Sequence, residues 1–368
     1  MRTRVISIDP SAPDEVIQVS VREAGAVLRR GGLVAFPTET VYGLGGDAFN
    51  EQAAARIYEA KGRPSDNPLI VHIADTRDLD RLLKDPADEA SQVAARLAEA
   101  FWPGPLTMVL NKADDLPLQT TGGLKTVAVR LPSNRIARAL IRAAGGYIAA
   151  PSANLSGRPS PTSASHCVDD LNGRVDLIID GGDCEIGLES TIVDLTTPVP
   201  EILRPGKITG EELFRALGKD ARHAFGEGFP SGSGDTGALT GPEEKAPRAP
   251  GMKYRHYAPK GQLVIVRGDT QTVRESIRAF LETARQEGKR TGVIAPDESS
   301  GIYAADVVLH TGRGADEDTL AHNLYRILRS MDETNVEQIF FEMPTDGYYT
   351  DAVKNRLYKA CGGRVIKV

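Results

Sequence analysis

The sequence has few cysteines, few aromatic residues and no long apolar run. The three cysteines, Cys167, Cys184 and Cys361, are too few and too scattered for a disulfide framework. No run approaches the roughly 18 apolar residues that a membrane span needs, and residues 1–10 lack the apolar stretch of a secretory signal. Hydrophobic residues (40%) and charged residues (26%) are at ordinary globular levels. We therefore expect a globular, cytoplasmic protein that does not enter a membrane.

Several catalytic and cofactor motifs are also absent. The sequence contains no G-x-x-x-x-G-K-[ST] phosphate loop and no G-x-S-x-G nucleophile elbow. Cys167 and the histidines have no partners at metal-ligand spacing, so we expect no metal site made by side chains alone. If this chain binds a nucleotide, another kind of loop must hold it.

Acidic residues are missing from one long stretch. The net charge is -6, which argues against a protein that coats nucleic acid with its whole surface. Residues 116–168 nevertheless contain no Asp or Glu, and the cations among them are Lys125, Arg130, Arg135, Arg138, Arg142 and Arg158. This stretch indicates a region that binds anions. For Arg135, Arg138 and Arg142, the solvated face of one helix is the simpler interpretation.

The first two thirds of the chain alternate between helical and strand patterns. Capping boxes at Ser20 with Glu23 and at Thr209 with Glu212 predict two helix starts. Further helices are expected at 50–62, up to Phe101, from Ser133 and from near Thr162. Short apolar runs predict strands at 33–37, 69–73, 106–110, 127–131, 147–150, 175–179 and 191–195. This pattern favours an α/β domain with one large twisted sheet.

A Gly- and Pro-rich segment follows, and the α/β pattern then restarts. Residues 225–251 contain seven glycines and four prolines, a composition typical of a linker. Beyond it, strands and helices alternate from 262 to 368, as in a small Rossmann-like domain. We expect a larger domain at 1–218, a linker at 219–259 and a smaller C-terminal domain at 260–368.

Two loops carry the clearest chemistry. Lys61-Gly62-Arg63 with Asn67 places two cations in a constrained loop that can grip a polyphosphate, although helix-terminal cations in a solvated turn are an equal alternative. Ser152-Ala153-Asn154, with Ser160 further on, follows a strand and precedes a helix, where free backbone N–H groups can hold an anion. An ordinary capping loop is the alternative there.

Further polar loops follow or precede other strands. They contain Thr38-Glu39-Thr40 with Tyr42, Glu189-Ser190-Thr191, and Arg204-Pro205-Gly206. If the strand ends face the same way, all of these loops converge on one edge of the sheet. That edge is the predicted active site.

These motifs together resemble the YrdC-like family of threonylcarbamoyl-AMP synthases. The resemblance rests on the segment 37–44, on the Lys-x-Arg of Lys61 and Arg63 with the Ser-x-Asn of Ser152 and Asn154, and on Glu189-Ser190-Thr191. It covers roughly residues 10 to 218. The segment 250–259 is similar to that of longer members, which carry a second, Rossmann-like domain.

The resemblance implies an enzyme that joins L-threonine, bicarbonate and ATP into threonylcarbamoyl-adenylate and releases pyrophosphate. It implies that the product passes to a separate transferase that modifies tRNA adenosine beside the anticodon, and that magnesium arrives with ATP. The implied catalytic residues are Lys61 and Arg63. The implied ATP-binding residues are Lys61, Arg63, Asn67, Thr126, Ser152, Asn154, Ser160, Arg204 and Tyr257. The implied threonine-binding residues are Thr40, His72, Arg130, Ala150 (through its backbone) and Ser190.

Two alternatives remain open at this point. His72 alone reads as an ordinary core histidine, and only the resemblance favours a ligand role for it. The acid-free stretch also allows a double-stranded RNA-binding module without turnover, and direct RNA binding is undecided. A carbamoyltransferase-like maturation domain would need a longer chain with zinc-finger cysteines, which are missing.

Overall fold

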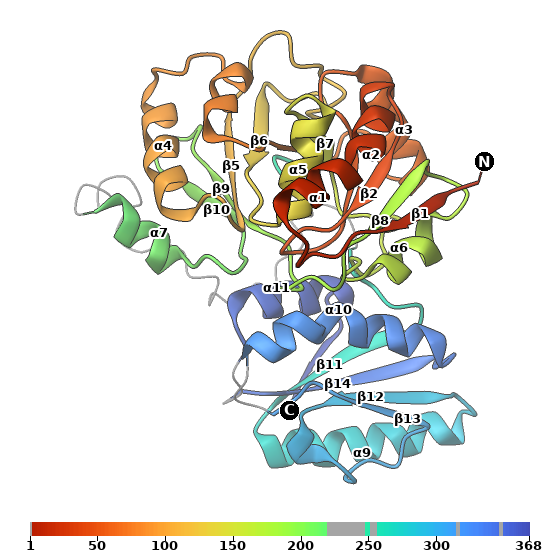
Figure 1. The fold of residues 1–368 in the computed structure, drawn as a ribbon. Coiled ribbons are helices and arrows are strands. Elements are labelled where there is room, and N and C mark those ends of the chain that lie inside the picture. The colour runs from red at the N-terminus through yellow and green to blue at the C-terminus, as the bar shows by residue number, and fades with distance from the viewer. Residues whose placement is uncertain (1, 219–246, 251–255, 314–316, 346–348) are drawn as a thin grey trace. The chain divides into compact units, whose positions relative to one another are not determined.

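The computed structural model describes residues 2–218, 247–250, 256–313, 317–345 and 349–368 (Figure 1). Within them the chain divides into two compact units. The first holds residues 2–156, 160–218 and 247–250. The second holds Gly157–Pro159 and the described residues from 256 onward. Most of the expected linker, at 219–246 and 251–255, lies outside the described residues.

A mixed ten-stranded sheet forms the centre of the first unit. Its spatial order is β1-β8-β2-β3-β7-β4-β6-β5-β9-β10. In chain order the strands are β1 (Arg4–Ser7), β2 (Val34–Phe36), β3 (Gly43–Asp47), β4 (Ile70–His72), β5 (Leu106–Asn111), β6 (Thr126–Arg130), β7 (Ile148–Ala150), β8 (Leu177–Asp180), β9 (Thr191–Asp194) and β10 (Glu201–Arg204). Strand β4 runs parallel to β6 and antiparallel to β7. The carboxyl ends of the strands therefore do not share one edge.

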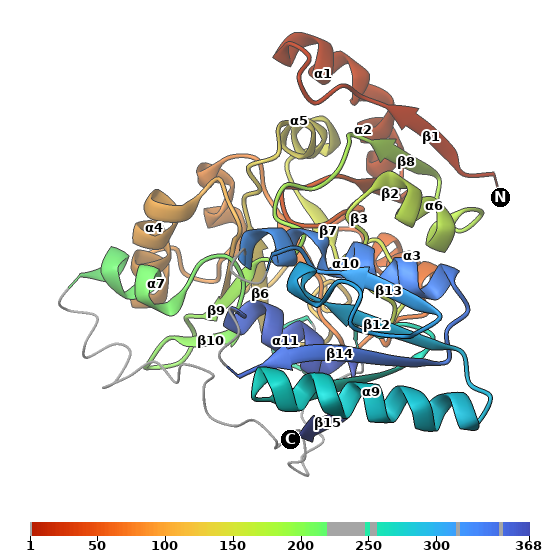
Figure 2. The same ribbon diagram turned by 90° about the horizontal axis from the view of Figure 1, so that it is seen from below.

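Helices cover the two faces of this sheet differently. They are α1 (Asp14–Ser20), α2 (Arg22–Arg29), α3 (Glu51–Lys61), α4 (Glu89–Phe101), α5 (Arg135–Ala144), α6 (Ala164–Leu171) and α7 (Gly210–Leu217). Helices α1, α2 and α5 pack together on strands β8, β2, β3 and β7 of one face (Figure 2). Helices α3, α4, α6 and α7 pack on the opposite face. In β2, β7 and β8 alternate residues enter these two cores, as the pleat of a strand requires.

The Gly-rich segment after β2 is a strand, although the apolar runs predict none between residues 37 and 69. Residues Gly43–Asp47 form β3 and pair antiparallel with β2 and β7. A Cβ atom on Gly45 would lie 2.8 Å from Ile148 Cγ2 and 3.0 Å from Phe36 Cε1. Glycine lets these strands pack against neighbouring side chains that a larger residue would strike.

Only one of the two predicted capping boxes forms. Thr209 Oγ1 accepts from Glu212 N at 3.2 Å, and the Glu212 carboxylate accepts from Thr209 N at 2.8 Å. Ser20 instead ends α1 and donates to Val16 O at 2.8 Å. The prediction for Ser20 was wrong because α1, which the sequence pattern missed, already includes this residue. The cap of α5 is Asn134 rather than Ser133.

A parallel five-stranded sheet, in the order β13-β12-β14-β11-β15, forms the second unit. Its elements are β11 (Gln262–Gly268), α9 (Thr270–Gln286), β12 (Thr291–Ala295), β13 (Val307–His310), α10 (Glu317–Glu333), β14 (Gln338–Pro344), α11 (Asp351–Ala360) and β15 (Val365–Lys367). Helix α9 lies on one face of the sheet, and α10 and α11 lie on the other (Figure 1). The Rossmann-like α/β expectation is therefore confirmed for this part.

Among the described residues, none of the helices combines the length and the apolar character that crossing a membrane requires.

Candidate active site

Antiparallel pairing brings the Lys-x-Arg and Ser-x-Asn loops together. Ile70 of β4 is the register partner of Ala150 of β7, so the start of β4 and the end of β7 lie at the same edge. Lys61 ends α3, and its Nζ donates to the carbonyl oxygens of Ser152 and Asn154. Ser156 N donates back to Lys61 O at 2.9 Å. Lys61 is only 2% exposed. Through these hydrogen bonds it joins two loops that are about 90 residues apart in the chain.

The loop before β4 is fixed by backbone acceptors and by a close approach. Gly62 adopts a left-handed conformation (φ 58°) that ends α3. Arg63, 8% exposed, donates from Nε to Asn67 O at 3.3 Å and from Nη2 to Pro68 O at 3.1 Å. Asn67 is 1% exposed, and its Oδ1 has no hydrogen-bond partner among the described residues. A Cβ on Gly122 would lie 2.9 Å from Asp66 O, so glycine allows the neighbouring loop to pack closely here.

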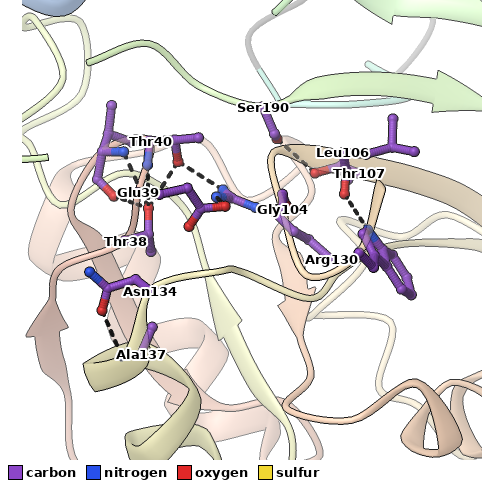
Figure 3. Close-up of polar contacts among 12 residues, drawn as sticks. Thr38, Glu39, Thr40, Gly104, Leu106, Thr107, Arg130, Asn134, Ala137 and Ser190 are labelled. Atoms are coloured by element: carbon purple, nitrogen blue, oxygen red, sulfur yellow. Dashed lines mark hydrogen bonds and ion pairs between the residues drawn. The ribbon is translucent and has the colours of Figure 1, made fainter. Parts of the chain in front are cut away.

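A second polar set lies in a row across three strands. His72 of β4 pairs in register with Arg130 of β6, which pairs in register with Thr107 of β5. Register partners in neighbouring strands point to the same face of a sheet. Arg130 Nη1 donates to Thr40 Oγ1 at 2.9 Å and its Nε donates to Gly104 O at 3.3 Å (Figure 3).

The carboxylate of Glu39 lies against the same guanidinium. Arg130 Nη2 is 2.7 Å from Glu39 Oε1, and the two side chains are 4% and 3% exposed. Figure 3 shows Glu39 and Thr40 pointing toward Arg130 from the loop after β2. The distance marks a close charge contact, although its angles do not meet hydrogen-bond geometry.

Ser190 connects this row to β10 through hydroxyl and guanidinium contacts. Ser190 Oγ is 2.7 Å from Thr107 Oγ1 and accepts from Arg204 Nη2 at 3.1 Å. Next to it, Glu189 Oε1 accepts from Ser160 Oγ at 2.6 Å. Ser160, which follows the Ser-x-Asn loop, is thus tied to the residue that precedes Ser190.

His72 is held neutral at the end of β4. Burial, followed by the neighbouring Arg130 charge, lowers its pKa from 6.5 to about 3. Its Nδ1 lies 3.1 Å from Ile70 O, and Phe36 contacts the ring edge-to-face at 6.1 Å between centroids. His72 can therefore offer hydrogen bonds but no positive charge near neutral pH.

The remaining predicted residues fall in three places. Thr126 begins β6 on the same face as Arg130, and Ala150 ends β7 beside the Ser152 loop. Tyr257 belongs to the second unit, where its ring lies 5.2 Å from that of Tyr325 between centroids. The predicted residues therefore do not converge on a single edge. One set lies near the start of β4 and contains Lys61, Arg63 and Ser152. The other lies near the end of β4 and contains His72 and Arg130.

Sequence reasoning gave no role to Thr107, Glu39 or Glu189. Glu39 and Glu189 stand in loops that it singled out, but no motif gave their carboxylates a role. Threonine is common in strands, so Thr107 in an apolar run carries no signal of its own. Its contact with Ser190 depends on the β5–β9 pairing, which is a tertiary feature.

The acid-free stretch does not keep its cations together as one exposed group. Arg130 is buried beside Glu39, and Arg135 donates to Asp14 and to the carbonyl oxygens of Pro10 and Ala12. Across the described ranges, no group of three His, Cys, Asp or Glu side chains could hold a metal ion. The arrangement instead offers cations, hydroxyls and amides, which suit a polyanion and a small polar molecule.

Comparisons with known proteins match the whole chain. A family model described as "Telomere recombination" covers residues 26–206, and one described as "Threonylcarbamoyl-AMP synthase, C-terminal domain" covers residues 208–362. The threonylcarbamoyl-AMP synthase of Pyrococcus abyssi is 46% identical over 96% of this chain and 98% of its own. The chain belongs to the threonylcarbamoyl-AMP synthase family. A Bacillus subtilis member of the family is 45% identical over 100% of both chains.

A solved member of the threonylcarbamoyl-AMP synthase family has the same fold. The crystal structure of P. abyssi Sua5 complexed with L-threonine matches with a TM-score of 0.85 and 45% identity, covering 100% of both chains. The family resemblance drawn from the Lys-x-Arg and Ser-x-Asn motifs is therefore confirmed, as is the two-domain α/β architecture.

Proposed function

We propose that this chain makes threonylcarbamoyl-AMP and pyrophosphate from L-threonine, bicarbonate and ATP, for the modification of tRNA. Family membership over the full chain supports the reaction. The observation in this structure that carries the proposal is the burial of Lys61 on the Ser152–Asn154 loop. This contact unites the two parts of the family's signature at one edge of the sheet.

The two polar sets suggest a division of labour. We assign ATP to Lys61, Arg63, Asn67, Thr126, Ser152, Asn154, Ser160, Arg204 and Tyr257, and threonine to Thr40, His72, Arg130, the Ala150 backbone and Ser190. The three residues of β4 span about 10 Å, so the two sets flank one short region. A crystal structure of a relative with bound L-threonine supports an amino-acid site in this fold.

The reaction needs no protein nucleophile. The threonine amine forms a bond to the carbon of bicarbonate with loss of water, and a carbamate oxygen then attacks the α-phosphorus of ATP while pyrophosphate leaves. The protein must align the reactants and offset negative charge on the phosphates. Arg63 and Lys61 supply positive charge, and Arg130 binds the threonine carboxylate. Magnesium would accompany the ATP substrate and would help to offset the negative charge of its phosphates.

The neutral His72 fits the threonine side of this assignment. An imidazole without charge can hydrogen-bond the threonine hydroxyl without repelling Arg130. Thr40 adds a hydroxyl that accepts from Arg130, and Ser190 adds one that contacts Thr107 and accepts from Arg204. These groups would distinguish threonine from amino acids that lack a side-chain hydroxyl.

The linker at 219–259, which connects the domains at 1–218 and 260–368 in the sequence, would cover the site. Ala249 is fully buried against β4, β5, β6, β9 and β10. Arg248 pairs with Asp194 at 2.9 Å and with Glu201 at 2.6 Å. The residues packed with Ala249 include Ile70, Val109 and Ala128, which lie on the face that carries His72, Arg130 and Thr107. Such a segment can exclude water that would hydrolyse the adenylate. Unchanged turnover after truncation at Gly218 would refute this cover.

Two further parts of the proposal concern the protein's setting. The unstable product would pass to a separate transferase that acts on tRNA. The three cysteines are buried and form no disulfide, which is compatible with a reducing, cytoplasmic location.

Pyrophosphate release tests the proposal. Wild-type protein with ATP and magnesium should release pyrophosphate only when both L-threonine and bicarbonate are present. Arg63→Ala should lower this rate at least about 100-fold, because the guanidinium is a buried, fixed charge at the phosphate site. Arg135→Ala, which removes an exposed arginine of the acid-free stretch, is the matched control and should keep the rate. RNA binding with a steep salt dependence and no turnover would favour the alternative.

A further inference from the structure

We propose that Glu39 binds the α-ammonium group of L-threonine while Arg130 binds its α-carboxylate. This inference rests on the proposed function and adds a residue to its substrate site. Glu39 and Arg130 would then form a receptor for the zwitterionic head of an amino acid. The side chain of Glu39 belongs to the loop after β2, and Arg130 ends β6 (Figure 3).

The first observation is unmet hydrogen-bonding capacity. Both carboxylate oxygens of Glu39 and Nη2 of Arg130 are buried, and none has a hydrogen-bond partner within the described ranges. A carboxylate accepts up to about four hydrogen bonds, and each terminal guanidinium nitrogen donates two. Leaving such groups unsatisfied in a buried site destabilises the folded state, and more so when they are charged. Their mutual attraction at 2.7 Å offsets only part of that cost.

The second observation is chemical complementarity. An ammonium group brings three donors to a carboxylate that lacks donors, and a substrate carboxylate brings acceptors to a guanidinium that lacks acceptors. The substrate ammonium meets the negative Glu39, and the substrate carboxylate meets the positive Arg130. The bound site therefore has no net charge from these four groups. A carboxylate ligand without an amine would instead bury one unbalanced negative charge beside Glu39.

The third observation is that the pair is held in place before substrate binds. Thr38 Oγ1 donates to Val41 O at 2.6 Å and accepts from the backbone N–H groups of Thr40 and Val41 at 3.2 Å. Ile186 N donates to Glu39 O at 2.8 Å. Arg130 is held by Thr40 and by Gly104 O. Substrate can therefore bind without ordering these loops anew, which favours affinity.

A neighbouring glutamate is already engaged. Glu189 accepts from Ser160 at 2.6 Å. Glu39 is thus the buried carboxylate beside Arg130 whose oxygens remain available in the described structure. Once the amine has become a carbamate it still carries one N–H group, so the same carboxylate can hold the nitrogen through both chemical steps.

Binding measured by calorimetry on the full chain tests this assignment. The probes are L-threonine and 3-hydroxybutyrate, which keeps the carboxylate and the hydroxyl but lacks the amine. We expect wild type to prefer threonine strongly. Glu39→Gln should weaken threonine binding about 10- to 100-fold, leave 3-hydroxybutyrate binding unchanged or stronger, and leave ATP binding unchanged.

A matched control removes a different buried glutamate that faces an arginine. Glu342 in the second unit is fully buried, with Oε1 3.1 Å from Arg274 Nε. Glu342 also accepts from Ser299 and Tyr303, so Glu342→Gln tests the general effect of neutralising a buried glutamate and should leave threonine affinity unchanged.

Three results would overturn the inference. Glu39→Gln could weaken both probes equally, as a purely structural role would require, or leave threonine binding unchanged. Wild type could also bind both probes equally well, and this result can be obtained even if the Glu39 variant does not fold. Wild-type turnover, measured in parallel, separates failure of this inference from failure of the proposed function. If the enzyme is active but threonine binding does not depend on Glu39, only the inference is wrong. If wild type neither binds threonine nor turns over, both are wrong.

Discussion

His72 shows how one residue ties the site to stability. It is fully buried between Arg130 and Phe36, and this environment lowers its pKa from 6.5 to about 3. The folded protein therefore excludes a proton that the unfolded chain accepts below pH 6.5. The same burial that keeps the imidazole neutral for a ligand makes the fold sensitive to acid.

The pH dependence of stability follows from this shift. Between pH 6.5 and pH 3 the unfolded state binds the extra proton, so stability falls as pH falls, by up to about 1.4 kcal/mol per pH unit from this group. We expect wild type to lose about 2 kcal/mol more than His72→Gln between pH 6.5 and pH 5. Urea unfolding followed at the two pH values measures the difference. Equal losses in both proteins would contradict the buried, neutral state of His72.

At the scale of single elements, the two capping patterns look alike in sequence and differ in structure. Thr209 with Glu212 begins α7, whereas Ser20 lies at the end of α1. Ser20 cannot begin a helix because it already belongs to α1 (Asp14–Ser20), and Ile17 is the only buried residue of that helix. A segment so short and so exposed has little periodic signal, so local pattern alone cannot place Ser20.

Hydrogen exchange should separate these two residues. Thr209→Ala removes a formed cap worth about 1 kcal/mol, so the amides of α7 should exchange roughly fivefold faster. Ser20→Ala removes only the contact with Val16 O, and protection in α2 should change less than about twofold. Equal acceleration in the two helices would mean that both boxes, or neither, act as caps.

Strands show what sequence can and cannot predict about this fold. The buried apolar run at 106–110 was found because it is continuous and strands favour such residues. Strand β3 was missed because Gly43, Gly45 and Gly46 lower strand propensity, while the close approach that requires them becomes visible only in the sheet. The loops of the site were predicted from their residues, but their division into two sets depends on strand direction.

At the scale of the whole chain, sequence and structure agree on two α/β parts. The alternation of strands and helices in the second unit was predicted, and three of its strands, β11, β12 and β14, consist mostly of buried residues. The contact between Glu39 and Arg130 was not predictable in this way. It joins residues 91 positions apart, and nothing in either local sequence announces the other.

The central claim also concerns the whole molecule. We propose that two loops joined by Lys61 hold ATP beside an amino-acid site. The chain belongs to the threonylcarbamoyl-AMP synthase family. Isotope incorporation tests it most directly. Purified protein should be incubated with ATP, magnesium, L-threonine and carbon-13-labelled bicarbonate, and its products examined by mass spectrometry. We expect threonylcarbamoyl-adenylate heavier by one mass unit than the unlabelled product, present with wild type and nearly absent with Arg63→Ala. Formation of AMP or ADP without any labelled adenylate, under conditions where wild type binds both ATP and threonine, would contradict the account.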